Sequence, residues 1–223
     1  MQFEKSSLSY LKKLKKNNNR DWFAEHKPTF IEAQNNAKAL YAEIRNNLEK
    51  HDDIEKFKLF RIYRDVRFSK DKTPYKAHFA GSFSRLGKQL RGGYYLRIRP
   101  GESFLAGGFW EPNKEDLFRI RKEIEVDASE FREILEDKNF QHYFGNSFKG
   151  DELKTAPRGF DKEHPDVDLL RKKGFIAVRN FTDEEVLSTN FSSEVDNSYK
   201  ALRPFFNLFS DILTTNLNGE SII

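Results

Sequence analysis

Residues 61–76 contain the densest set of side chains in the chain that could bind an anion. The segment reads RIYRDVRFSKDKTPYK. Its arginines offer a planar fork that fits a phosphate or a carboxylate through two parallel hydrogen bonds. Its lysines lie in an expected loop, where ammonium groups and backbone amides can gather around a phosphate. The segment has no Walker-type glycine-rich loop, so hydrolysis of a nucleoside triphosphate by that route is not expected.

The charge of the chain is concentrated around this segment. The whole chain has 39 basic and 35 acidic residues, a formal net charge of +4. Residues 58–99 hold twelve basic residues, seven of them arginines, against two acidic ones, and the remainder holds 27 basic against 33 acidic. Either the acidic ends neutralise the basic middle in the fold, or the basic middle meets an anionic ligand.

Arg64 poses the sharpest question within the segment. Side chains alternate from Phe57 onwards, and if this strand continues to Phe68, Arg64 lies on its apolar face between Ile62 and Val66. A buried guanidinium without a partner would cost several kcal/mol. We therefore expect Arg64 to meet an internal carboxylate, for example from a helix, several carbonyls, or the anion of a ligand.

The candidate ligand-binding residues are cationic or titratable side chains of the basic segment and one arginine from a later loop. They are Arg64, Arg67, Lys70, Lys72, Lys76, His78, Arg97, Arg99 and Arg158. On a strand expected at 94–99, the two guanidiniums of Arg97 and Arg99 project from one face.

The loop from Arg158 to Asp166 also carries a histidine and three carboxylates, and both acid–base chemistry and a plain polar loop account for it. No catalytic residue is assigned.

Metal, thiol and membrane chemistry find little support in the sequence. The chain has no cysteine, and its five histidines show neither HxxxH nor HExxH spacing, so no metal site and no cofactor are predicted. No apolar run approaches the roughly 20 residues of a membrane span, and the first residues lack the apolar core of a signal peptide. We expect a cytoplasmic protein with no membrane partner.

The pattern of apolar residues predicts which elements position these groups. Helices are expected around residues 6–16, from Asn19 to Leu48 with a restart at Pro28, after Asn113, at 128–137, at 166–171 and from about Ser192 to the C-terminal region, with a kink at Pro204. Strands are expected from Phe57, at 77–85, 94–99, 104–110 and 175–179, with a tight turn at 100–103. Because the strands cluster between helical ends, we predict an α+β fold, a mainly antiparallel central sheet with helices from both chain ends packed on it, in a single domain of residues 1–223.

Gly107 and Gly108 interrupt one of these expected strands. Glycine in a strand indicates a bulge or a close approach by another backbone or a ligand.

Four separated blocks resemble a known family. They are NRDWF at 19–23, RDVRFSKDKTPYK at 64–76, GGYY at 92–95 with GGFW at 107–110, and PRGF at 157–160 followed by His164-Pro165. In this order they are similar to the domain-of-unknown-function 2461 family, over nearly the whole chain. The resemblance implies no activity and no catalytic residue.

Three classes of function are consistent with the sequence. The first is an anion-binding protein, with or without enzymatic activity, that holds a phosphate- or carboxylate-bearing small molecule in a pocket lined with arginine and lysine. The second is a nucleic-acid-binding protein that uses the interleaved basic and aromatic residues of 58–99. The third is a scaffold or interaction protein whose charges are internal pairs and solvated surface.

Overall fold

The computed structural model describes residues 1–216 and 219–223, and its fold is α+β. Five antiparallel strands form one sheet in the order β1-β2-β3-β4-β5. The strands are β1 (Ile54–Leu59), β2 (Phe79–Arg85), β3 (Gly93–Ile98), β4 (Ser103–Phe109) and β5 (Phe175–Phe181). The helices are α1 (Lys5–Lys16), α2 (Arg20–Glu25), α3 (Lys27–Leu48), α4 (Lys114–Val126), α5 (Ser129–Glu136), α6 (Lys138–Phe144), α7 (Val167–Leu170), α8 (Asp183–Val186), α9 (Phe191–Ala201) and α10 (Arg203–Thr214). The predicted fold class is confirmed.

The chain divides into two compact units. Unit 1 comprises Met1–Phe83, Tyr95–Leu105 and Asn180–Asn197, and unit 2 comprises Ser84–Tyr94, Ala106–Arg179 and Ser198–Ile223. Strands β2 to β5 each contribute residues to both units. The single domain expected from the sequence stays a prediction.

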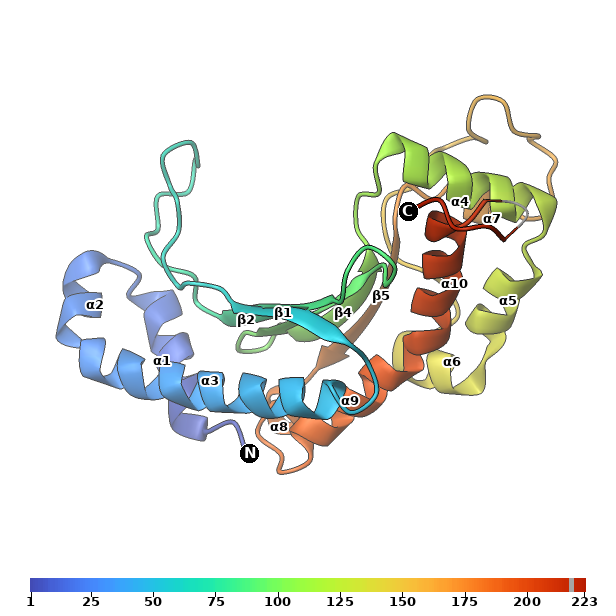
Figure 1. The fold of residues 1–223 in the computed structure, drawn as a ribbon. Coiled ribbons are helices and arrows are strands. Elements are labelled where there is room, and N and C mark those ends of the chain that lie inside the picture. The colour runs from blue at the N-terminus through green and yellow to red at the C-terminus, as the bar shows by residue number, and fades with distance from the viewer. Residues whose placement is uncertain (217–218) are drawn as a thin grey trace. The chain divides into compact units, whose positions relative to one another are not determined.

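Unit 1 is built on the long helix α3, which lies along one side of the strands (Figure 1). Pro28 stands in the first turn of α3, where its missing N–H has no partner to lose. Tyr41 anchors the helix because its hydroxyl donates to the carbonyl of Leu96 at 2.9 Å, and a Cβ on Gly81 would lie 2.8 Å from its ring. One face of the strands in this unit is thus covered by α3.

Unit 2 is held together by phenylalanine. The ring of Phe209 lies 4.8 Å from that of Phe109, 4.7 Å from that of Phe205 and 5.1 Å from that of Phe175, measured between centroids. Aromatic rings bury large areas and favour such tilted or offset contacts. The aromatic content of the sequence therefore builds the core of this unit.

Gly107 and Gly108 serve this packing. A Cβ on Gly107 would lie 2.3 Å from the side chain of Leu202, and one on Gly108, where φ is +137°, would lie 2.2 Å from the carbonyl oxygen of Phe175. The sequence left open a bulge or a close approach by another backbone or a ligand. The structure shows a close approach by neighbouring protein groups. No ligand is needed to explain this pair of glycines.

Several expected elements differ in the structure. The prediction that the strand from Phe57 continues to Phe68 is wrong, because β1 spans Ile54–Leu59 and irregular chain follows. Helices α6 and α8 were not predicted individually. The final helix is interrupted at Leu202, and Pro204 stands in the first turn of α10 instead of kinking one continuous helix. No helix among the described residues has the length and apolarity needed to cross a membrane.

Candidate anion-binding site

The basic segment forms an extended arm, residues 60–76, which rises from the strands of unit 1 on the side away from α3 (Figure 1). Its two halves run antiparallel: the N–H of Lys76 donates to the carbonyl of Ile62 at 2.7 Å, and that of Arg64 to the carbonyl of Pro74 at 2.9 Å. Proline has no N–H to return, so the pairing stops short of a regular ladder. The result is a hairpin-like arm whose tip is residues 65–73.

Arg64 fastens the tip of the arm. Its guanidinium pairs with the carboxylate of Asp71, donates to the Thr73 hydroxyl and reaches the Thr73 carbonyl at 3.2 Å. A hydrogen bond from the Thr73 N–H, and then the bond from Arg64, lower the pKa of Asp71 to about 2. Arg64 therefore does not lie on an apolar sheet face, and it meets a carboxylate of its own loop.

The other predicted residues of the tip divide between internal contacts and solvent. Arg67 is 77% exposed and pairs with Asp65 at 2.7 Å. The Lys72 ammonium donates to the carbonyls of Val66 at 3.0 Å and Arg67 at 3.3 Å, so it connects the two halves of the tip. Lys70 is exposed.

A shallow hollow of about 430 Å³ is lined by residues from the tip of the arm, by Pro74 and by residues at the start of α2. Arg20 and Lys72 line it, together with Asn18, Asn19, Val66, Thr73 and Pro74. Its lining holds two cations and no carboxylate. Arg20 was not among the predicted residues, although it lies in the block NRDWF at 19–23, one of the four that resemble the family.

The remaining four predicted residues of unit 1 gather on the side of the sheet opposite α3. We call Lys76, His78, Arg97 and Arg99 the cationic face. On β3, Tyr95 and Arg97 are half-buried and alternate with the buried Tyr94, Leu96 and Ile98. The period of two thus turns Arg97 away from the α3 side of the sheet.

Aromatic rings connect the members of this face. The ring of Tyr95 lies 6.4 Å from that of Phe60 and 5.5 Å from that of Phe104. The Lys76 ammonium lies 5.8 Å from the Phe60 centroid, and the Arg97 guanidinium 4.4 Å from the Phe104 centroid. These are cation–π distances, and they place charges over a continuous aromatic floor.

Glu102, in the turn between β3 and β4, is the acidic residue that pairs with Arg97 and Arg99. Its carboxylate lies 3.2 Å from Arg99 and 3.9 Å from Arg97, and it also meets Lys15 at 3.5 Å. Arg97 donates in addition to the Glu102 carbonyl at 3.1 Å. The Nε atoms of both arginines are buried, and among the described residues neither has a hydrogen-bond partner. One carboxylate therefore serves three cations, and two guanidinium donors stay unused.

His78 reports the positive potential of the face. Burial, followed by the charges of Arg97, Lys76 and Arg99, lowers the pKa of His78 to about 4, against a smaller opposing effect of Glu102. The pKa of Lys76 is lowered as well, first by burial and then by neighbouring cations. Both shifts come first from burial, and the crowded positive charge of the face adds to them.

Arg158 belongs to unit 2, whereas the other eight predicted residues belong to unit 1. Its side chain is exposed. In the same loop, Nδ1 of His164 accepts from the Asp166 N–H at 3.0 Å, and Nε2 lies 3.3 Å from the carbonyl oxygen of Glu125. Arg132 engages Asp166 at 2.7 Å. These contacts secure the loop to α4 and α5.

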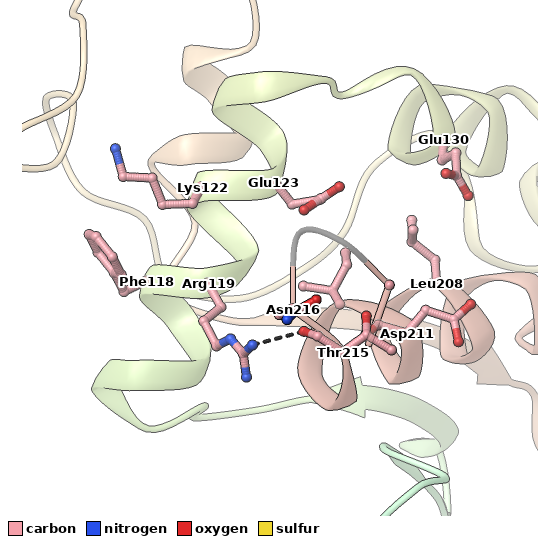
Figure 2. A pocket seen from close by; sticks show the side chains of 11 residues that line it. Phe118, Arg119, Lys122, Glu123, Glu130, Leu208, Asp211, Thr215 and Asn216 are labelled. Atoms are coloured by element: carbon pink, nitrogen blue, oxygen red, sulfur yellow. Dashed lines mark hydrogen bonds between the residues drawn. The ribbon is translucent and has the colours of Figure 1, made fainter. Parts of the chain in front are cut away.

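A cavity of about 420 Å³ in unit 2 has a different character (Figure 2). It lies beside α4 and α10, and Arg119 donates across it to the carbonyl of Thr215 at 2.8 Å. Three carboxylates line it, from Glu123, Glu130 and Asp211, against the cations of Arg119 and Lys122. This lining does not favour an anion. Throughout the described residues, no three His, Asp or Glu side chains are grouped so that they could hold a metal ion.

The comparisons with known proteins give one match. A family model described as "Conserved hypothetical protein (DUF2461)" matches residues 6–208. No curated protein and no solved structure matches the chain. The description names no ligand and no reaction, so the geometry has to carry the functional argument.

Proposed function

The chain belongs to the DUF2461 family, and we propose that it binds a phosphate- or carboxylate-bearing ligand on the cationic face of unit 1. Lys76, His78, Arg97 and Arg99 are the residues that would contact the anion. The proposal is one of binding, and it assigns no reaction. The absence of cysteine suits the reducing cytoplasm, which we propose as the place of action.

The observation that carries the proposal is the excess of unused positive charge on this face. A buried N–H without a partner costs about 1–3 kcal/mol. The Nε–H groups of Arg97 and Arg99 are buried, and no described residue accepts a hydrogen bond from them. An incoming anion would supply the missing acceptors and relieve the repulsion around His78. Arginine is suited to the task because its fork can hold two oxygens of one anion.

A comparison of the cationic face with the arm argues against a purely structural role for the face. In a scaffold, the charges would be consumed by internal pairs, and this describes the arm well: Arg64 meets Asp71, and Arg67 meets Asp65. The cationic face differs, because among the described residues Glu102 is the one carboxylate that meets several cations there. This excess of positive charge favours the face as the place where the anion binds.

A thermal-shift experiment tests the proposal. Phosphate, sulfate and citrate are titrated against the full chain at low salt. For a Kd of about 1 mM, roughly 10 mM anion stabilises the native state by about 1.4 kcal/mol, which raises Tm by about 3–6 °C in a chain of this size.

Arg97→Gln should abolish this shift, because it removes a charge-assisted contact with the anion that is worth about 1.5–3 kcal/mol. Lys38→Gln is the matched control: it also removes one positive charge, from an exposed position on α3, and should leave the shift intact. A shift that survives in a folded Arg97→Gln variant, or that Lys38→Gln removes equally, would contradict the proposed site.

A further inference from the structure

We infer that the ligand of the cationic face is a single-stranded nucleic acid, and that Phe68 at the tip of the arm stacks on one of its bases. This inference rests on the proposed anion site, because the same cations would neutralise the phosphates. It adds to that site a second contact, the arm, and a class of ligand.

Phe68 is the most exposed large apolar side chain among the described residues, at 97%. In this position its ring gives the fold none of the stabilisation that burial would bring. The Arg67 guanidinium lies 5.9 Å from the ring centroid, and the three cations of residues 65–73 outnumber the two carboxylates there. A bare aromatic face among positive charges is the combination by which proteins bind unpaired bases without reading sequence.

The tip is held in place before any ligand arrives. Lys72 donates to the carbonyls of Val66 and Arg67, which precede Phe68 in the chain, and Arg64 ties Asp71 and Thr73 from the other side. A loop already ordered in its binding conformation loses little entropy on binding. These internal contacts therefore present Phe68 on a fixed support.

The charge of the arm continues that of the face. Residues 58–76 contain seven basic residues against two acidic ones, and Arg61 and Lys70 are exposed. Phe60 links the two regions, because Lys58 and Lys76 lie over its ring at 5.6 Å and 5.8 Å at the base of the arm. A chain of phosphates could thus meet positive charge from the tip to the sheet.

The aromatic rings of the face and the ring of Phe68 at the tip differ in how far they are exposed to solvent. On the face, lysine lies over Phe60 and arginine over Phe104, so the groups available there are cations. At the tip, the Arg67 guanidinium lies near the ring of Phe68, but this residue is still 97% exposed. This division matches a nucleotide chain, which needs both phosphate neutralisation and a stacking surface.

A lipid membrane is the other anionic surface that an exposed phenylalanine can enter. The carboxylates of Asp65 and Asp71 flank Phe68, and their side chains are 47% and 58% exposed. Insertion of the tip into a bilayer would strip these carboxylates of water, whereas stacking of Phe68 on a base leaves them in water. In duplex DNA the bases are already stacked, so a single ring at the tip reaches unpaired bases best.

The test uses fluorescence anisotropy of a labelled oligo(dT) with the full chain at low salt. Phe68→Ala should weaken binding about 5- to 150-fold, the effect of losing one stacked base, while Phe68→Trp should retain it. Phe118→Ala removes a second exposed phenylalanine, in unit 2, and should leave affinity unchanged. With about four phosphates contacted, affinity should fall roughly 50-fold between about 50 and 200 mM salt.

Several results would overturn the inference. They are equal binding by Phe68→Ala, equal affinity for a duplex of the same length, or binding of phosphatidylserine vesicles without binding of the oligonucleotide. If sulfate stabilises the wild type through Arg97 and no oligonucleotide binds, the nucleic-acid inference fails and the anion site stands. If neither binds, both fail.

Discussion

Replacement of His78 by glutamine should change how the stability of the protein depends on pH. The pKa of this imidazole is about 4 in the folded chain, because of burial and the nearby cations, against 6.5 for a free histidine. Between these values the unfolded chain binds a proton that the folded chain does not. Stability should therefore be lost as pH falls from 6.5 towards 4, and regained as pH rises.

The size of the effect follows from the two pKa values. At pH 5 the difference in proton binding corresponds to about 2 kcal/mol, and contact of the ring with solvent, which screens the charges, reduces this to about 1–2 kcal/mol. In His78→Gln this contribution disappears from both states. From pH 7 to pH 5 the wild type should then lose about 1–2 kcal/mol more stability than the variant.

Urea unfolding, followed by tryptophan fluorescence at both pH values, measures this difference directly. The comparison with the variant cancels the contributions of the other histidines and of the carboxylates. Sulfate adds a second readout, since its charge is constant over this range. A bound anion should favour protonated His78, so sulfate affinity should rise at pH 5 in the wild type only. Equal losses of stability in the two proteins would refute the reasoning.

Two further predictions concern packing and the arm. Gly108→Ala should lower the free energy of unfolding by at least about 3 kcal/mol, because the new Cβ would collide with the Phe175 carbonyl at a positive φ. Gly101→Ala is the control: its φ is also positive but nothing lies within 4 Å, so it should cost about 1 kcal/mol in the same urea denaturation assay. Arg64→Gln should leave global stability within about 1 kcal/mol but accelerate tryptic cleavage in the arm, as seen by mass spectrometry; unchanged cleavage would show that the Arg64–Asp71 pair does not order the tip.

The hairpin of β3 and β4 illustrates what the sequence could predict. Alternating side chains on both sides of Pro100-Gly101 predicted two strands and a tight turn, and β3 and β4 lie there with shifts of one residue at each boundary. The alternation also predicted correctly that Arg97 faces away from buried Leu96 and Ile98. Local periodicity sufficed because each strand keeps its register across a short turn.

The arm shows where local periodicity misleads. The alternation after Phe57 continues past Leu59, but the partner segment contains Pro74, which cannot donate to a ladder, and only an isolated bridge between Tyr63 and Tyr75 remains. The burial inferred for Arg64 depended on a continuous strand. Its real partner, Asp71, comes from the returning half of the arm, a contact that no spacing rule specifies.

The composition of the site was accessible only in part. Counting charges identifies the basic segment, yet it cannot separate cations that are paired, such as Arg67 with Asp65, from those left over on the face. The sequence places Glu102 only in a turn, although its carboxylate meets both Arg97 and Arg99. Such assignments depend on which side chains the tertiary fold brings within a few ångströms.

The central claim is that the cationic face holds positive charge that Glu102 only partly neutralises, and isothermal titration of Glu102→Gln with sulfate tests it most directly. The carboxylate competes with a ligand for Arg97 and Arg99, so its removal should tighten sulfate binding by about fivefold, equivalent to about 1 kcal/mol. Glu32→Gln, at an exposed position on α3, makes the same change in net charge and should have no effect. Unchanged or weaker binding by a folded Glu102→Gln variant would contradict the account.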